Sequence, residues 1–235
     1  MHNRISKIQT SDVNVPRANG KDKMTSFLAY PEGNGPFPGL LVIHEIFGLN
    51  DNIREIARRF AGEGYAALAI DLFSNRNRAI CILQAFYGMM FRPLDNPLLA
   101  DLQSSLDYLG QLPEVDSAHL GAVGFCMGGG YALQLAVTDK GMKAASVFYG
   151  ANPKPLDAVA RSCPIVGSYP DKDFTTDAAR KLDAALTRHE VPHDIKIYDN
   201  TLHSFFNRQR TGFEVEASKD AWQRMLSFFE KQLIA

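Results

Sequence analysis

The sequence predicts one α/β domain over residues 1–235, built on a mostly parallel central sheet of about eight strands with helices on both faces. From residue 39 onward, short apolar runs alternate with stretches of helical character, which is typical of parallel strands joined by right-handed crossovers. No internal repeat, low-complexity tract or linker divides the chain, and its 235 residues are a common length for one α/β domain.

Two segments near the N-terminus, residues 5–15 and 23–30, show the partial alternation of apolar and polar residues that is typical of half-buried strands. Between them lies Asn19-Gly20, a dipeptide that favours tight hairpin turns. We therefore predict an N-terminal antiparallel hairpin at one edge of the sheet.

The remaining elements follow from uninterrupted apolar runs and from helical periodicity. Strands are predicted at residues 39–45, 65–70, 120–123, 143–150, 163–168 and 193–198, and helices at residues 53–61, 98–110, 131–137, 178–188 and 217–233. Residues 74–97 interrupt this order. Because loops at the carboxyl edge of an open α/β sheet bind ligands, we interpret them as a lid or pocket-lining segment, with a plain connector as the alternative.

The heptad Gly-Phe-Cys-Met-Gly-Gly-Gly at residues 124–130 lies between a strand-like run and a helix-like stretch. This is the pattern of a nucleophile on a sharp strand-to-helix turn, with Cys126 where serine is usual. Glycines let the strand and the helix pack closely, and the helix N-terminus is expected to lower the pKa of the thiol. The alternative is a buried, unreactive cysteine in a glycine-rich turn.

A nucleophile of this kind needs a base and an acid that orients the base, and both follow it on later strands. His203 lies directly after the last predicted strand and is the predicted base, although a loop histidine is most often simply solvated. Asp171 and Asp173 both follow the preceding strand, and either could instead shape a turn. We select Asp173 as the acid.

Five motifs in this order resemble the dienelactone hydrolase family of α/β hydrolases, and the likeness covers most of the chain. They are the motifs at residues 44–49, 63–65 with 70–72, 124–129, 171–173 and 203–205. The resemblance implies an α/β-hydrolase fold and a cysteine-nucleophile hydrolase that opens lactone or ester bonds through a thioester. A general carboxylesterase or thioesterase, and a non-catalytic binding protein, are the alternatives.

The same resemblance implies a catalytic triad of Cys126, Asp173 and His203. It places Glu45 beside the thiol, where it would hold the thiol proton until an anionic substrate binds. The backbone N–H groups of Ile46 and Met127 would form the oxyanion hole. Because an unpaired buried carboxylate is costly, the structural alternative for Glu45 is a salt bridge or a set of hydrogen bonds.

Members of the family hold the carboxylate of their substrate with two arginines. Where one of these is expected, this chain has Asn207, with Arg208 one residue later, and Arg76 and Arg78 are available for the other. We name Arg78, Arg208 and Tyr149 as candidate substrate-binding residues, the last because a Tyr-Gly pair matches one near the family's pocket. Tyr149 could equally be a core residue.

The composition, with 46% hydrophobic and 22% charged residues and a net charge of −1, is that of an ordinary globular protein and shows no electrostatic signature of nucleic-acid or membrane binding. Three cysteines do not make a disulfide framework, and the N-terminus lacks the apolar core of a secretory signal. No metal-ligand spacing or dinucleotide fingerprint is present. We expect a cytoplasmic protein with a small-molecule substrate and no cofactor.

Overall fold

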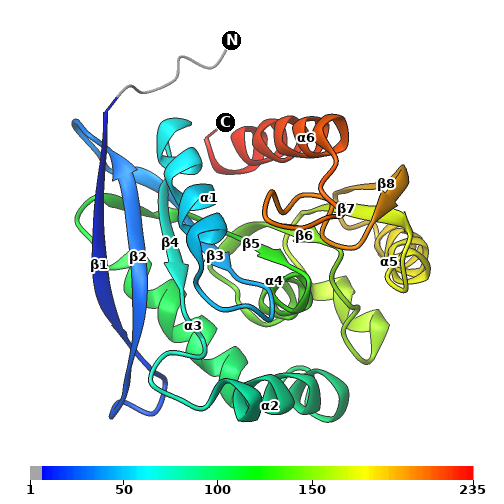
Figure 1. Cartoon of the computed structure of the whole chain (residues 1–235), viewed down its shortest axis with the longest axis horizontal. Helices are drawn as coiled ribbons and strands as arrows, with labels where there is room; N and C mark the ends of the chain where they lie inside the picture. Colours follow the sequence, from blue (N-terminus) through cyan, green and yellow to red (C-terminus); the bar gives the residue numbers. More distant parts are fainter. Residues whose placement is uncertain (1–6, 235) are drawn as a thin grey trace.

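A twisted sheet runs through the computed structural model, which describes residues 7–234 (Figure 1). The strands are β1 (Ile8–Pro16), β2 (Lys23–Pro31), β3 (Phe37–Ile43), β4 (Ala66–Ile70), β5 (Val115–Phe125), β6 (Met142–Phe148), β7 (Ile165–Lys172) and β8 (His193–Leu202). The helices are α1 (Asp51–Gly62), α2 (Arg78–Phe91), α3 (Pro97–Gly110), α4 (Met127–Thr138), α5 (Thr176–Arg188) and α6 (Val215–Leu233), with a short 3-10 helix η1 (Leu156–Arg161).

The strand order is β1-β2-β4-β3-β5-β6-β7-β8. β1 pairs antiparallel with β2, and β2 pairs antiparallel with β4, whereas every neighbouring pair from β4 to β8 is parallel. The eight strands, the N-terminal hairpin and the mostly parallel sheet predicted from the sequence are thereby confirmed. Residues 5 and 6 of the predicted first strand lie outside the described residues.

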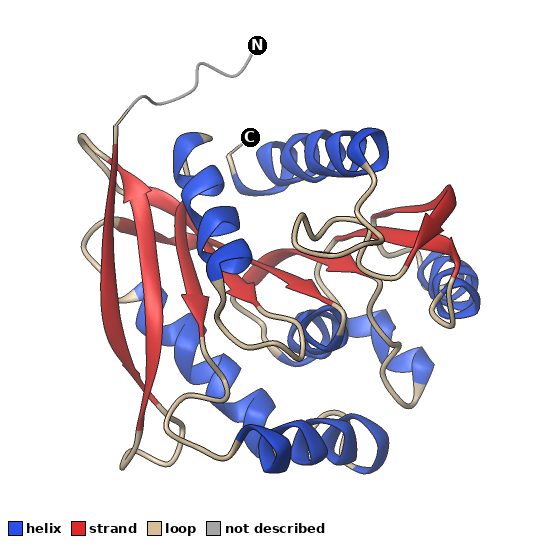
Figure 2. Ribbon diagram, viewed as in Figure 1, coloured by secondary structure: helices blue, strands red, loops and turns tan. Residues whose placement is uncertain are grey.

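Helices cover both faces of the sheet, as predicted, and each face has its own apolar core (Figure 2). α1 and α6 pack on one face, where the rings of Phe60 and Trp222 lie 4.7 Å apart. α3, α4 and α5 pack on the other face. Because both faces are covered, the central strands are apolar on both sides, and every residue of β4 is buried.

A helix that the sequence pattern did not reveal, α2, occupies most of the segment of residues 74–97. The side chain of Asn77 caps its N-terminus by accepting a hydrogen bond from the Ile80 N–H. The apolar residues of α2 lie on all sides of the helix, so α2 lacks the one-sided apolar periodicity from which helices are predicted. Some of these residues face solvent, and Leu83 is 71% exposed. No helix in residues 7–234 is long and apolar enough to cross a membrane.

A buried ion pair ties the turn of the N-terminal hairpin to α3, and the same arginine is hydrogen-bonded to the segment that follows β4. Arg17, directly after β1, donates to Asp101 of α3 at 2.6 Å and to the carbonyls of Leu72 and Ser74 at 3.1 and 3.0 Å. Both charged side chains are almost fully buried. Removing one partner would leave the other charge buried without its counter-ion, which is far more costly than breaking an exposed pair.

We therefore expect Arg17→Met to lower the free energy of unfolding by about 3 kcal/mol or more. Arg92→Met is the matched control, because Arg92 pairs with Asp95 at the same 2.6 Å but both side chains are exposed. That change should cost less than about 1 kcal/mol. Urea unfolding of the two variants checks the difference, and equal losses would contradict the role of burial.

Candidate active site

Cys126 occupies the sharp turn between β5 and α4, with backbone angles φ 55° and ψ −116°. A positive φ is unusual for a residue with a side chain and indicates strain that the surroundings enforce. A Cβ on Gly124 would lie 1.9 Å from the Gly128 carbonyl oxygen, and one on Gly128 would lie 2.4 Å from that of Ile43. Only glycine at both positions lets the turn close and pack against the end of β3.

The surroundings of the Cys126 thiol favour its protonated form at neutral pH. Burial raises its pKa to about 12, the negative charge of Glu45 adds to the rise, and a hydrogen bond from the Met127 backbone N–H opposes it. The sequence-based expectation of a lowered pKa was therefore wrong. Burial and a neighbouring carboxylate outweigh the stabilisation that the N-terminus of α4 offers a thiolate.

His203 and Asp173 meet in the loops that follow β8 and β7. The His203 Nδ1 lies 2.8 Å from the Asp173 Oδ2, and the Thr175 hydroxyl donates to the same oxygen at 2.5 Å. The imidazole lies between two aromatic rings, with centroid distances of 4.9 Å to Tyr149 and 5.1 Å to Phe174. This arrangement directs Nδ1 toward the acid and leaves Nε2 for proton transfer.

Asp171, the alternative acid, has a different environment. Its Oδ1 accepts a hydrogen bond from the Thr201 N–H at 3.0 Å, and backbone hydrogen bonds from Asn200 and Thr201 lower the pKa of its carboxyl. Asp171 thus joins the end of β7 to the neighbouring strand. Of the two aspartates, only Asp173 has a contact with His203 among the described residues.

Glu45, directly after β3, is buried and is held by neutral donors. The hydroxyls of Ser204 and Tyr149 donate to its Oε1 at 3.1 and 3.4 Å, and the Asn207 side-chain amide donates to its Oε2. Burial raises the pKa of Glu45, while these hydrogen bonds and His203 oppose the rise. Of the two structural alternatives, a salt bridge or a set of hydrogen bonds, the Glu45 carboxylate has the hydrogen bonds. No cationic side chain in residues 7–234 forms a salt bridge with it.

Ser204 and Asn207 are site residues that the sequence analysis did not assign to Glu45. In the sequence, Ser204 belongs to the motif at residues 203–205 and Asn207 stands where an arginine is expected, but nothing there links either side chain to Glu45. Tyr149, named from the sequence as a candidate for substrate binding, is 1% exposed, and its hydroxyl is directed at Glu45. The three donors come from two loops at the carboxyl edge of the sheet, so only the tertiary structure brings them to one carboxylate.

The two candidate oxyanion donors lie on adjoining segments, because the turn at Cys126 packs against the end of β3. No acceptor among the described residues takes the Ile46 N–H. The Ile46 carbonyl accepts from Arg78 Nε at 3.2 Å and from its Nη2 at 2.8 Å, so this arginine adjoins the candidate oxyanion hole. Met127, the second donor, is the first residue of α4.

Arg208 lies elsewhere, in a cavity of about 310 Å³ that it shares with Arg59, Lys219 and Trp222. The arginine nearer to the candidate oxyanion hole is Arg210. Its guanidinium carbon lies 4.6 Å from the ring centroid of Phe47, which is the residue after Ile46. Arg210 was not among the residues predicted from the sequence, because nothing in the order of residues 207–210 indicates which side chain turns toward the loop after β3.

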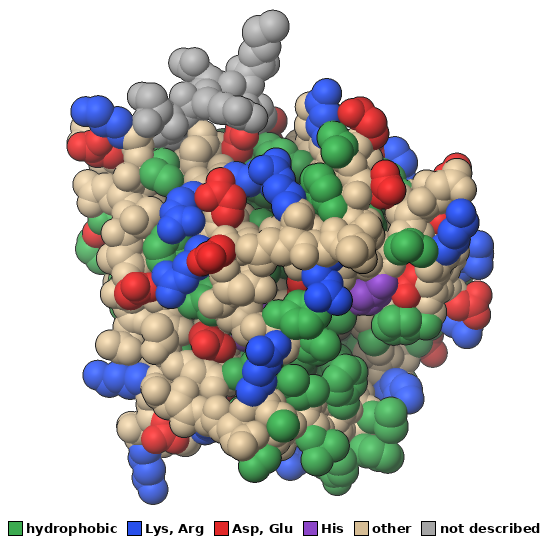
Figure 3. Space-filling model, in the orientation of Figure 1, with side chains coloured by type: hydrophobic (Ala, Val, Ile, Leu, Met, Phe, Trp, Pro, Cys, Tyr) green, Lys and Arg blue, Asp and Glu red, His purple; other side chains and the backbone are tan. Residues whose placement is uncertain are grey.

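Helix α2 packs against the start of α4 and presents an apolar surface to solvent. The Tyr131 hydroxyl of α4 donates to the Ala85 carbonyl of α2, and a Cβ on Gly130 would lie 3.0 Å from the Met89 sulfur. Exposed apolar side chains gather over α2 in Figure 3. They are Ile80, Leu83, Phe86, Tyr87, Met90 and Phe91.

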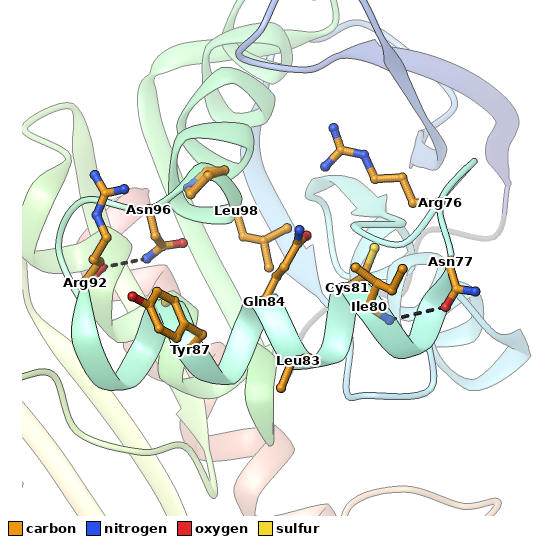
Figure 4. Close-up of a pocket in the computed structure, with 12 residues that line it drawn as sticks. Arg76, Asn77, Ile80, Cys81, Leu83, Gln84, Tyr87, Arg92, Asn96 and Leu98 are labelled. Carbon is orange, nitrogen blue, oxygen red and sulfur yellow. Dashed lines mark hydrogen bonds between the residues drawn. The ribbon is translucent and has the colours of Figure 1, made fainter.

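A cavity of about 840 Å³ runs along α2 and the start of α3, between Arg76 at one end and Arg92 at the other (Figure 4). Its walls include Ile80, Tyr87 and Leu98, and no triad residue lines it. Within residues 7–234, no group of three or more His, Cys, Asp or Glu side chains converges in a way that could hold a metal ion.

Comparison with known proteins is consistent with this geometry. The sequence profile described as "Dienelactone hydrolase family" matches residues 24–233. A protein of Saccharolobus solfataricus, provisionally named a carboxymethylenebutenolidase, is 34% identical, with 89% of this chain and 94% of the relative covered. A relative of the same name from Synechocystis is 30% identical, with 96% and 98% covered.

Solved structures similar to this chain include dienelactone hydrolase-type proteins. A protein from Klebsiella pneumoniae, provisionally named a dienelactone hydrolase, superposes with a TM-score of 0.84 at 29% identity over 96% of this chain and 100% of its own. A dienelactone hydrolase-like promiscuous phosphotriesterase from metagenomic libraries superposes with a TM-score of 0.82 at 27% identity, over 96% of this chain and 98% of its own. An esterase from Pyrobaculum calidifontis shares the fold: its TM-score is 0.71 at 15% identity, over 97% of this chain and 87% of its own.

The raised pKa of Cys126 predicts how its alkylation depends on pH. Because the thiol loses its proton only near pH 12, the thiolate fraction and the rate of alkylation by iodoacetamide should rise about tenfold per pH unit from pH 7 to 10. Mass spectrometry of the Cys126 peptide measures this rate. Glu45→Gln, which removes a charge that raises the pKa, should speed alkylation at pH 8. A plateau below pH 8 in the unmodified protein would contradict a protonated resting thiol.

Proposed function

This chain belongs to the dienelactone hydrolase family, and with that premise we propose that it hydrolyses lactone or ester bonds with Cys126 as nucleophile, His203 as base and Asp173 as orienting acid. Family membership makes the chain a hydrolase of ester or lactone bonds. The observation that most supports the mechanism is the 2.8 Å contact between His203 and Asp173, in the same edge of the sheet as the strained turn at Cys126.

In the first half-reaction, the Cys126 sulfur attacks the acyl carbon and its proton passes to the Nε2 of His203. Asp173 accepts the hydrogen bond from Nδ1 and stabilises the imidazolium that forms. The negative oxygen of the tetrahedral intermediate lies between the Ile46 and Met127 N–H groups, each worth about 3 kcal/mol where such donors have been removed. The leaving alkoxide takes the proton from His203, and a thioester remains.

In the second half-reaction, His203 takes a proton from water, and the hydroxide equivalent attacks the thioester carbonyl. The second tetrahedral intermediate uses the same two N–H groups, and its collapse returns a proton to the sulfur and releases the acid. Esters and lactones suit this site better than amides, because their leaving groups are better.

Glu45 keeps the thiol protonated, and therefore unreactive, until substrate binds. Its charge raises the pKa of Cys126, and the donors from Ser204, Tyr149 and Asn207 hold it in place. A protonated thiol resists oxidation, since the thiolate is the form that oxidants attack. The described cysteines are free thiols, which supports a reducing compartment such as the cytoplasm.

Two candidate functions differ in the charge of the substrate: hydrolysis of a lactone that carries a carboxylate, and hydrolysis of neutral esters. Among the candidate substrate-binding residues, Arg78 adjoins the oxyanion loop, so a lactone with a carboxylate would direct its charge there. Against this, Asn207 occupies the place where the family resemblance expects an arginine, and the apolar Met89 of α2 lies against Gly130 in the first turn of α4. These observations favour neutral, apolar esters, and a general carboxylesterase is the second candidate.

The decisive experiment measures hydrolysis of p-nitrophenyl butyrate and of a dienelactone by the unmodified protein and by Cys126→Ala. We expect the variant to lose at least about a thousandfold in kcat with both substrates while remaining folded by circular dichroism. The ratio of kcat/KM for the two substrates then decides between the ester and the carboxylate-bearing lactone. Turnover by Cys126→Ala near that of the unmodified protein would contradict the thiol mechanism.

The two aspartates give a matched pair of substitutions. Asp173→Asn should lower kcat by about 10³ to 10⁴, because an amide cannot hold the required imidazole tautomer or stabilise its charged form. Asp171→Asn retains an oxygen that accepts from the Thr201 N–H and should leave kcat nearly unchanged. The reverse ranking would identify Asp171 as the acid.

A further inference from the structure

His44 is fully buried beside the proposed oxyanion loop, and the proposed mechanism does not use it. It precedes Glu45 at the carboxyl end of β3, and its ring contacts Phe73 edge-on with a centroid distance of 4.8 Å. Its Nδ1 lies 2.5 Å from the Glu45 carbonyl oxygen, and its Nε2 lies 3.1 Å from the Leu72 backbone nitrogen. The imidazole therefore bridges the segments that follow β3 and β4.

These two partners determine the protonation state of His44. A backbone N–H can only donate, so Nε2 must be the unprotonated nitrogen that accepts from Leu72. A carbonyl can only accept, so Nδ1 must hold the hydrogen. Burial, with a smaller effect of Arg78, lowers the pKa of His44 and favours this neutral form, although the hydrogen bond to the Glu45 carbonyl and the charge of Asp71, 3.6 Å from Nε2, oppose the lowering.

The Glu45 carbonyl belongs to the same peptide unit as the Ile46 N–H. Because that unit is planar and trans, its C=O and N–H bonds point in opposite directions, and anchoring one aims the other. The carbonyl accepts from His44 and also from the Gly48 N–H at 3.3 Å. Arg78 anchors the next carbonyl, that of Ile46, so the peptide is held on both sides.

We propose that His44 is a positioning residue for the oxyanion hole: by donating from Nδ1 to the Glu45 carbonyl, it aims the Ile46 N–H at the developing negative oxygen. This inference rests on the proposed function, because it requires the Ile46 N–H to be an oxyanion donor. His44 touches neither the substrate nor the thiol in this role. Its effect is confined to steps in which charge develops on the acyl oxygen.

Two substitutions separate positioning from simple support of the fold. In His44→Asn, the amide nitrogen replaces Nδ1 and retains the bond to the Glu45 carbonyl, while the bond to Leu72 is lost. In His44→Gln, the amide oxygen replaces Nε2 and retains the bond to the Leu72 N–H, while the bond to Glu45 is lost. Each variant therefore loses one of the two hydrogen bonds, and their thermal stabilities serve as the internal control.

We expect His44→Gln to lower kcat for p-nitrophenyl butyrate by about 10- to 100-fold with little change in KM, a fraction of the effect of deleting an oxyanion donor. His44→Asn should stay within about threefold of the unmodified protein, since the Glu45 carbonyl remains anchored. The rate at which iodoacetamide alkylates Cys126 should be the same in both variants, because alkylation forms no oxyanion. Equal kcat values for the two variants, or losses of kcat that follow Tm or the alkylation rate, would overturn the proposal.

A measurement without substrate tests the same inference if either variant fails to fold. The ¹⁵N spectrum of the His44 ring in the unmodified protein should show a protonated Nδ1 and an unprotonated Nε2, unchanged between pH 6 and 9. A protonated Nε2 would overturn the proposal. Hydrolysis that survives Cys126→Ala would instead contradict the proposed function and leave the tautomer result standing, so the two failures are distinguishable.

Discussion

The close approach of the turn at Cys126 to the end of β3 is the contact on which the rest of the site depends. It is possible only because Gly124 and Gly128 lack Cβ atoms, which would overlap backbone atoms of the turn and of Ile43. This contact places the thiol at the N-terminus of α4 and sets the residues that follow β3 beside it. Glu45, Ile46 and His44 all lie on that adjoining segment, so the contact brings the buried carboxylate and one candidate oxyanion donor next to the turn that holds the thiol and the Met127 N–H.

Glu45 shows how this arrangement favours a protonated thiol. A buried carboxylate without a counter-ion is costly, and neutral donors from Ser204, Tyr149 and Asn207 offset part of that cost without neutralising its charge. The remaining charge, together with burial, keeps the neighbouring thiol protonated. An arginine in place of Asn207 would have compensated the charge, so the amide at this position gives the site a different electrostatic balance from the one the family resemblance implies.

The sequence predicted the fold with few errors, because central parallel strands are continuous apolar runs and most helices here have one apolar face. It failed for α2, whose apolar residues lie on all sides of the helix, six of them exposed to solvent. At the site, Cys126, Asp173 and His203 were selected from the sequence because they follow the strands now seen as β5, β7 and β8. The expected lowering of the thiol pKa was wrong, because a helix N-terminus is visible in the sequence whereas burial and the distance to Glu45 are not.

By itself, the sequence determined the alternation of strands and helices of an α/β domain, the glycine-lined turn and the residue types available at the site, since each of these depends on local chain geometry or on spacing along the chain. Only the tertiary structure decided that Asp173 and not Asp171 meets His203, that Asn207 turns to Glu45 while Arg208 turns to a cavity against α6, and that His44 bridges two strand ends. These outcomes depend on the directions of side chains in loops. Loop directions are set by contacts between segments far apart in the sequence, which no local pattern encodes.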